Sequence, residues 1–107
     1  MKFARYLAHG QISYGVVEGD SVKDLSASPF EDYKVIDHTH KLSEVKLLAP
    51  CLPSKILAIG LNYSSHMGDR TPPAEPMVFF KTLSSVIGPD DTIIRPKGTA
   101  KLDAECE

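Results

Sequence analysis

Two acidic side chains in the sequence have a spacing suited to a metal ion. Glu105 and Glu107 are separated by one residue, so on a β-strand both carboxylates would point to the same face, roughly 7 Å apart along the chain. Two like charges there repel unless a cation lies between them, and Mg²⁺, Mn²⁺ or Ca²⁺ would prefer such oxygen ligands. The polar face of an edge strand or a frayed terminus would give the same pattern, so spacing alone leaves both interpretations open.

A second set of polar residues follows the apolar run 56–59. Gly60 is expected to allow a turn that a side chain would obstruct, and Asn62, Tyr63 and His66 come directly after it. Rigid strands often hold binding residues in the loops at their ends. His66 is therefore a candidate functional residue, although a histidine held in a loop by backbone groups would look the same.

The pair His38 and His40 also suggests metal binding. Two histidines one residue apart lie on one face of a strand and can bind zinc or copper. The sequence offers no third soft or imidazole ligand at a useful spacing, so the pair is not predicted to be a metal site.

The elements expected in the first half of the chain form an antiparallel meander. Strands are predicted at 3–7, 12–17 and 21–25, with turns at His9-Gly10 and around Gly19, and the alternation of Ile12, Tyr14 and Val16 predicts one buried face. Residues 26–41 are turn-rich and are expected to form a loop with at most one short helical turn. Residues 42–48 fit either a helical face or a strand.

The second half is expected to supply the strands that position the candidate site. Strands are predicted at 56–59, 77–81 and 92–94, followed by a last acidic strand that ends at Glu107. The Gly- and Pro-rich segment 67–76 between the first two is either a mobile lid or a plain connector. Pro50 and Pro53 mark the predicted junction between residues 1–50 and residues 51–107.

Composition excludes several function classes. The 107 residues carry a formal charge of −2, with 42% apolar and 24% charged residues, which is typical of a globular chain without an electrostatic footprint for nucleic acid or an anionic membrane. No apolar run is long enough for a transmembrane helix, and Arg5 interrupts the N-terminal stretch that a signal peptide would need. Two cysteines are too few for a disulfide scaffold, so a cytoplasmic location is expected.

Several motifs in order resemble the fumarylacetoacetate hydrolase family. Gly60-x-Asn62-Tyr63-x-x-His66 is similar to the family's opening signature, and Met77-Val78-Phe79-Phe80-Lys81 to its apolar strand that ends in lysine. Ser84 to Pro89 and Ile93 to Pro96 resemble its next loop and strand. Residues 102–107 resemble its Glu-x-Glu metal-binding strand. The resemblance covers about half the chain, and residues 1–50 resemble a small N-terminal module that some members carry.

The resemblance implies a fold and a set of site residues. The expected fold is mostly β (α+β), with a small antiparallel N-terminal module at 1–50 and the first strands of a mixed-sheet catalytic domain at 51–107. His66 would be the general base and Asp69, where the family usually has Glu, would orient it. Glu105 and Glu107 would bind Mg²⁺, with Mn²⁺ or Ca²⁺ as alternatives. Lys81, with help from Arg70, would bind a substrate carboxylate or carbonyl.

The implied activity is metal-assisted hydrolysis, isomerisation or decarboxylation of 1,3-diketo or 2-oxo acids. Examples are C–C hydrolysis of acylpyruvates and isomerisation of 2-hydroxyhepta-2,4-diene-1,7-dioate, and the family implies a homodimer. The family's third metal ligand, an aspartate from later in the chain, has no counterpart up to Glu107. The alternative is a non-catalytic fragment or interaction module. A nucleotide-binding domain has little support because no Gly-x-Gly-x-x-Gly or Walker-type run occurs.

Overall fold

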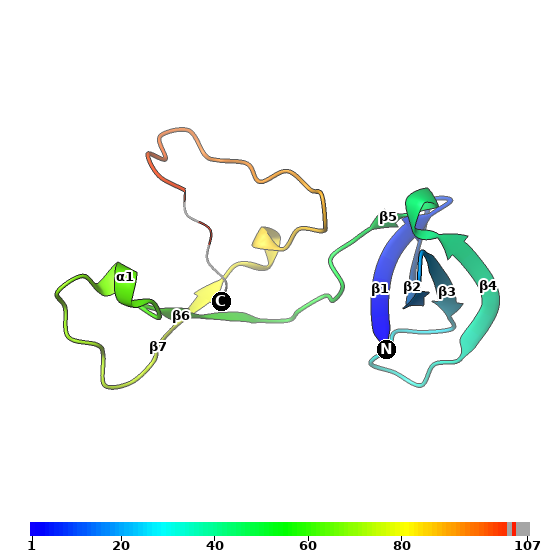
Figure 1. Ribbon diagram of the computed structural model, residues 1–107, viewed down its shortest axis with the longest axis horizontal. Coiled ribbons are helices and arrows are strands. Elements are labelled where there is room, and N and C mark those ends of the chain that lie inside the picture. The colour runs from blue at the N-terminus through cyan, green and yellow to red at the C-terminus, as the bar shows by residue number, and fades with distance from the viewer. Residues whose placement is uncertain (103, 105–107) are drawn as a thin grey trace. The chain divides into compact units, whose positions relative to one another are not determined.

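The computed structural model describes residues 1–102 and 104, apart from the side chain of His66. Within these residues the protein is mostly β, as predicted, with antiparallel sheets and little helix (Figure 1). The chain forms two compact units. The first consists of Met1–Leu52 and Ile87–Asp91, and the second of Pro53–Val86 and the residues from Thr92 onward.

The first unit is a curved five-stranded antiparallel sheet with the strand order β4-β3-β2-β1-β5 (Figure 1). Its first three strands confirm the predicted meander: β1 is Lys2–Ala8, β2 Gln11–Glu18 and β3 Ser21–Leu25. The β1–β2 turn has positive φ at both His9 (48°) and Gly10 (80°), the pattern of a type I′ hairpin. Gly19 (φ 61°) opens the two-residue turn between β2 and β3.

The main core cluster of this unit, Ala4, Tyr6 and Val22, packs on the face of β2 opposite to the predicted one. On the predicted face Val16 is buried (6% exposed) but Ile12 is 57% exposed, so the predicted burial of this face holds at Val16 and is wrong at Ile12. The cluster forms on the other face because Gly15 has no side chain, which lets β3 and Tyr6 approach closely. A Cβ at Gly15 would lie 2.4 Å from Val22 Cγ2 and 2.6 Å from the Lys23 carbonyl oxygen.

The segment predicted to be a loop, residues 26–41, contains strand β4 at Val35–Lys41. β4 pairs antiparallel with β3, and the register shifts between Lys23 and Leu25. The prediction failed because β4 carries few apolar side chains and is stabilised by its pairing with a distant partner. Polar strands of this kind lack the alternation from which strands are recognised.

Both alternatives for residues 42–48 occur in part. A 3₁₀ turn, η1, spans Leu42–Glu44, and the two-residue strand β5, Lys46–Leu47, pairs with β1. The distant segment Ile87–Asp91 also belongs to this unit. It is held by the Lys46 Nζ to Asp91 Oδ1 ion pair (2.9 Å), and the Gly88 N–H donates to Asp91 Oδ2.

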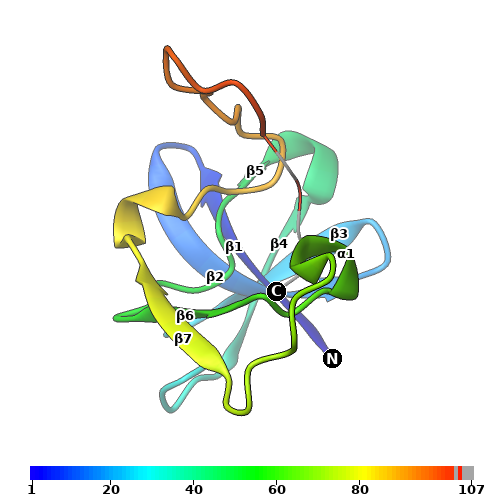
Figure 2. The same cartoon turned by 90° about the vertical axis from the view of Figure 1, so that its left-hand side faces the viewer.

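The second unit is built on a two-stranded antiparallel sheet of β6, Ile56–Gly60, and β7, Met77–Lys81 (Figure 2). Between them lies the four-residue helix α1, Ser64–Met67, and after β7 the 3₁₀ turn η2, Leu83–Ser85. Every residue of β7 is exposed, and Phe80 is 75% exposed. The side chains of β7 therefore lack apolar cover among the described residues, whereas Ala58 on β6 is buried (3% exposed).

Two local predictions in this unit differ from the structure. Gly60 does not have a positive φ, because it still pairs with Met77; the chain enters the left-handed region at Leu61 (φ 54°). The predicted strand 92–94 has no regular structure, because an apolar run needs a partner strand to form a ladder, and none pairs with it among the described residues. The last acidic strand lies largely outside the described residues. No helix in the described part of the chain has the length and apolar character needed to cross a membrane.

Candidate functional site

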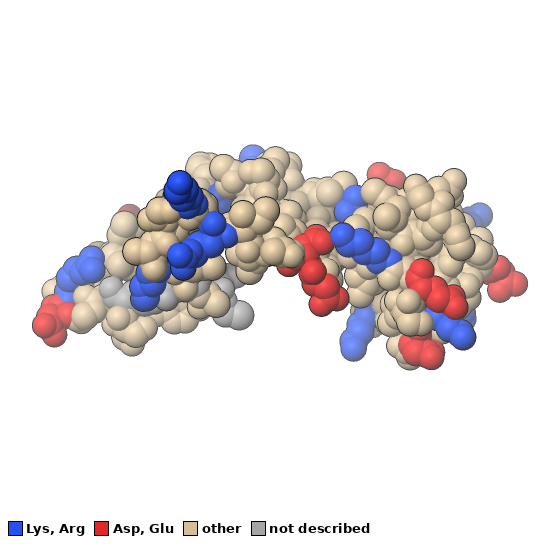
Figure 3. All heavy atoms as spheres, turned by 90° about the horizontal axis from the view of Figure 1, so that it is seen from above, with Lys and Arg blue, Asp and Glu red and all other residues tan. Residues whose placement is uncertain are grey.

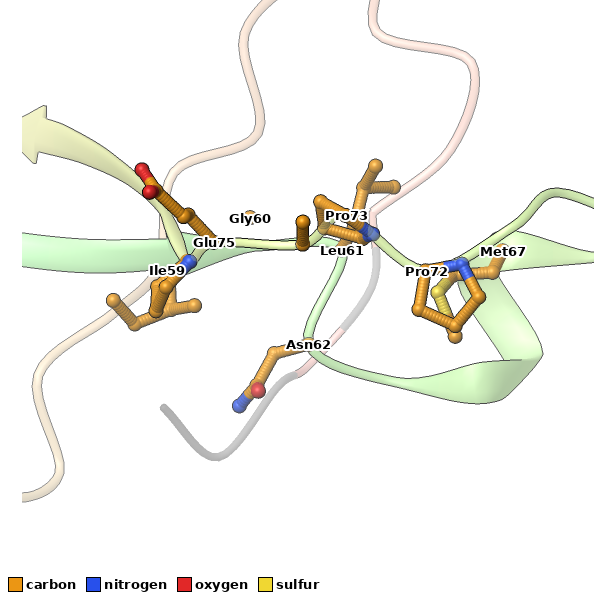
Figure 4. Close-up of a pocket in the computed structure, with 10 residues that line it drawn as sticks. Ile59, Gly60, Leu61, Asn62, Met67, Pro72, Pro73 and Glu75 are labelled. Carbon is orange, nitrogen blue, oxygen red and sulfur yellow. The ribbon is translucent and has the colours of Figure 1, made fainter.

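A pocket lies at the end of β6, where the sequence motif begins. Its volume is about 310 Å³. It is lined by the end of β6, by α1 and by the proline-rich segment that leads into β7: Ile59, Gly60, Leu61, Asn62, Met67, Pro72, Pro73, Ala74, Glu75 and Pro76 (Figure 4). The three residues that open the signature, Gly60 to Asn62, therefore form one wall.

The polar groups of this pocket are Asn62 and Glu75. Figure 4 shows their side chains directed to different sides of the chain. Leu61, directly before Asn62, has a positive φ (54°) and lines the same pocket. A non-glycine residue in this region carries conformational strain, and such strain is concentrated at functional sites. The pocket thus combines an apolar lining, two polar groups and a strained residue.

The predicted catalytic residues lie beside this pocket in sequence and local structure. His66 is part of α1, Ser64–Met67, but its side chain is outside the described part of the chain. Asp69 and Arg70 follow the helix directly, after Gly68 (φ 55°), and both are exposed. The Arg70 N–H donates to the Met67 carbonyl (3.1 Å), which fixes the backbone after the helix.

Lys81 is at the other end of the two-stranded sheet. It pairs with Ile56, whereas Gly60 at the pocket pairs with Met77. Four residues of strand separate the two ends, about 13 Å at 3.3–3.4 Å per residue. The Lys81 ammonium lies 5.8 Å from the ring centroid of Phe79. The structure therefore does not bring Lys81 to the Asn62 end of the sheet, and its role in substrate binding stays a prediction.

Glu105 and Glu107, the predicted metal ligands, lie outside the described residues. On the face seen in Figure 3, the second unit (left) shows mainly basic side chains, whereas the first unit shows both signs. The sequence of the second unit, residues 53–86 and 92–107, carries five acidic residues (Asp69, Glu75, Asp103, Glu105 and Glu107) and these six basic ones: Lys55, Arg70, Lys81, Arg95, Lys97 and Lys101.

The sequence did not predict a cluster of Asp24, His38 and His40 in the first unit. One ligand atom from each lies within 4.8 Å of the others. Spacing along the chain reveals no third ligand for the histidine pair, because that ligand is the Asp24 carboxylate on β3. Only the pairing of β3 with β4 brings Asp24 close to His38 and His40. The signal that was missed is the antiparallel return of β4 beside Asp24.

Two family models match the chain on either side of the proline-flanked junction. The model described as "Rv2993c-like, N-terminal" matches residues 1–50, and that described as "Fumarylacetoacetate (FAA) hydrolase C-terminal" matches residues 55–107. The chain belongs to the fumarylacetoacetate hydrolase family. The motifs that suggested the family all lie within residues 55–107, the segment that the fumarylacetoacetate hydrolase model matches.

Similar proteins include named enzymes. A protein of Archaeoglobus fulgidus is 39% identical over 105 residues, which are 96% of this chain and 38% of that protein. The 2,4-didehydro-3-deoxy-L-rhamnonate hydrolase of Sphingomonas sp. (strain SKA58) is 35% identical over 122 aligned residues, covering 100% of this chain and 42% of the hydrolase. This fumarylacetoacetate hydrolase family chain thus spans about two fifths of these curated relatives.

A solved structure shows the same fold. The 5-carboxymethyl-2-hydroxymuconate delta-isomerase of Mycobacterium smegmatis superimposes with a TM-score of 0.67 at 30% identity, covering 81% of this chain and 35% of the isomerase. Relatives of the chain are thus named as a hydrolase and as an isomerase.

Proposed function

We propose that this chain is the N-terminal part of a fumarylacetoacetate hydrolase-family enzyme that acts on 1,3-diketo or 2-oxo acids. The observation that carries the proposal is the match of residues 55–107 to the family, together with the pocket at Gly60 to Asn62. Residues 1–50 would be the small N-terminal module and residues 51–107 the start of the catalytic domain. The division into two compact units near residue 52 supports this assignment.

The roles of the residues follow from their chemistry. His66, on α1 beside the pocket, would accept a proton from water or from the substrate, since a histidine pKa lies near neutral pH. Asp69, three residues later, would orient that ring by accepting a hydrogen bond. Arg70 and Lys81 would offset the charge of a substrate carboxylate.

Two carboxylates, Glu105 and Glu107, would hold a divalent cation, and their oxygen donors suit Mg²⁺ or Mn²⁺. A cation bound there would polarise the chelating oxygens of a dicarbonyl substrate. The reaction would then depend on which proton His66 removes: taking one from water would let that water attack the substrate and give C–C hydrolysis, and taking one from the substrate and returning it to another carbon would give isomerisation. Loss of CO₂ from a 2-oxo acid is the third outcome.

The test is an assay of the enzyme that carries this chain as its N-terminal part, with an acylpyruvate and with oxaloacetate, in the presence of Mg²⁺ or Mn²⁺. We expect turnover that falls roughly 10²–10⁴-fold in His66→Ala, because general acid–base catalysis contributes a factor of this size. The Glu105→Ala, Glu107→Ala double variant should lose both the activity and any stabilisation by the cation. Lys55→Ala, a basic residue one position before β6, serves as the matched control and should keep the activity. Equal turnover in the parent and His66→Ala would refute the proposed base.

A second candidate function is a non-catalytic interaction module. The observation that favours it is the exposed apolar sheet: Leu57, Val78 and Phe80 are 58%, 57% and 75% exposed. Under this alternative the cation changes neither the melting temperature of the chain nor its ligand binding. Cation-dependent stabilisation that requires Glu105 and Glu107 would exclude it.

A further inference from the structure

A second cluster of potential metal ligands lies in the first unit, separate from the residues of the proposed function. The Asp24 carboxylate accepts a hydrogen bond from His38 Nδ1 at 2.8 Å, and His40 Nε2 lies 3.6 Å from the other carboxylate oxygen. The buried Tyr6 hydroxyl also donates to Asp24. The two imidazoles are in edge contact, with ring centroids 4.5 Å apart.

The separations of these atoms are compatible with a bound zinc ion. Ligand bonds of 2.0–2.1 Å at a tetrahedral angle place neighbouring ligand atoms about 3.3 Å apart. His38 Nδ1 lies 2.8 Å from Asp24 Oδ2, and His40 Nε2 lies 3.6 Å from Asp24 Oδ1. One ligand atom from each of the three residues lies within 4.8 Å of the others, so side-chain movements of about 1.5 Å or less would bring the three to the separation that a bound ion requires.

The surroundings of Asp24 are also those of a metal-binding carboxylate. Its carboxylate accepts hydrogen bonds from the buried Tyr6 hydroxyl and from His38 Nδ1. The Tyr6 hydroxyl fixes its orientation, and such supporting hydrogen bonds are typical of metal ligands.

From this geometry we infer that Asp24, His38 and His40 bind a divalent transition-metal ion, with Zn²⁺ the fitting ion. Two imidazoles and one carboxylate suit Zn²⁺ better than Mg²⁺ or Ca²⁺, which prefer oxygen ligands. Three protein ligands leave the fourth position to water.

The position of the cluster indicates what the ion does. Asp24 lies near the end of β3, and both histidines lie on β4, at the register shift between these strands. Residues 26–34 connect the two strands without a regular ladder of their own. A bound ion would cross-link β3 and β4 where their pairing is irregular, so the site is a structural clamp of the N-terminal unit.

The test is Zn²⁺ binding by the full chain carrying Glu105→Ala and Glu107→Ala, which removes the other predicted metal site. Competition with a chromophoric chelator measures the affinity, and the visible spectrum of Co²⁺ reports the ligand geometry. We expect one equivalent of Zn²⁺ per chain, and at least a tenfold loss of affinity in His38→Gln. The His38 side chain is 60% exposed, so its replacement should leave the fold intact, whereas His40 is only 10% exposed.

Asp37→Asn is the matched control, because Asp37 is exposed and adjacent to His38 but lies outside the cluster. It should bind Zn²⁺ as the parent does. Three results would overturn the inference: no binding by the parent, equal affinity in the parent and His38→Gln, or a loss in Asp37→Asn as large as that in His38→Gln. Circular dichroism of each variant checks that the fold is kept.

Discussion

Replacing Gly15 by alanine should destabilise the first unit strongly. Gly15 lies in β2 opposite Asp24, and the added Cβ would sit 2.4 Å from Val22 Cγ2, 2.6 Å from the Lys23 carbonyl oxygen and 3.1 Å from Tyr6 Cε1. Val22 and Tyr6 are fully buried. Neither the buried side chains nor the backbone oxygen can move away without disturbing the sheet, so the contact cannot be relieved locally.

The magnitude follows from two opposing effects. Overpacking a well-packed core costs about 1–3 kcal/mol. Alanine in a strand regains roughly 0.5–1 kcal/mol of the backbone entropy that glycine loses on folding, but the clash with a backbone oxygen places the site at the upper end of the overpacking range. The net cost should be about 2 kcal/mol, which lowers the melting temperature by roughly 8–16 °C for a domain of this size.

The assay is thermal and urea unfolding of the parent and Gly15→Ala, followed by far-ultraviolet circular dichroism. Gly60→Ala is the matched control: it also lies in a strand, but its Cβ would meet only ordinary contacts, the nearest at 3.6 Å. The double variant Gly15→Ala, Val22→Ala should cost less than the sum of its single variants, because it removes the closest contact. Equal melting temperatures for Gly15→Ala and the parent would refute the close approach of β3 to β2.

Three further predictions concern other parts of the chain. The hydrogen bonds from Lys46 and from the Gly88 N–H lower the pKa of Asp91, so the charged carboxylate stabilises the fold. Asp91→Asn should therefore lower the free energy of unfolding at neutral pH. In urea unfolding, the difference between this variant and the parent should vanish as falling pH protonates the carboxyl. Tyr6→Phe keeps the buried ring but removes the hydrogen bond to Asp24, and should cost about 1.5–3 kcal/mol in the same assay; an unchanged stability would contradict the bond. Amides of β6 and β7 should exchange with solvent far faster than those of β1 and β2, because a two-stranded sheet with one fully exposed strand is marginal in water. Equal protection of the two sheets, measured by NMR, would contradict this.

The parts of the fold that local signals specify could be predicted. β1, β2 and β3 alternate and are joined by tight turns with glycine, and β6 and β7 are short apolar runs, so each element can be recognised without knowing its partner. The family motifs likewise lie in continuous stretches. The sequence could predict the elements whose formation depends on residues close to one another along the chain.

The parts that depend on distant partners could not be predicted. β4 is polar and exists because β3 pairs with it, whereas residues 92–94 are apolar and have no regular structure. The face of β2 that is buried depends on Gly15 and the curvature of the sheet, which alternation alone does not reveal. Asp24 meets His38 and His40 only through the register of β3 and β4, so the cluster was invisible to an analysis of spacing.

Because Ile87–Asp91 belongs to the first unit, residues 53–86 of the second unit are an insertion between two segments of the first unit. Closing a loop carries an entropic cost that grows only slowly with its length, so insertions or deletions inside this segment should be tolerated by the first unit. Cutting the chain after Leu52 has a different effect. The Gly88 to Asp91 turn would then have to bind from solution and would lose the high effective concentration that covalent linkage provides. A fragment that ends at the sequence junction would therefore lack a structural component of its own unit.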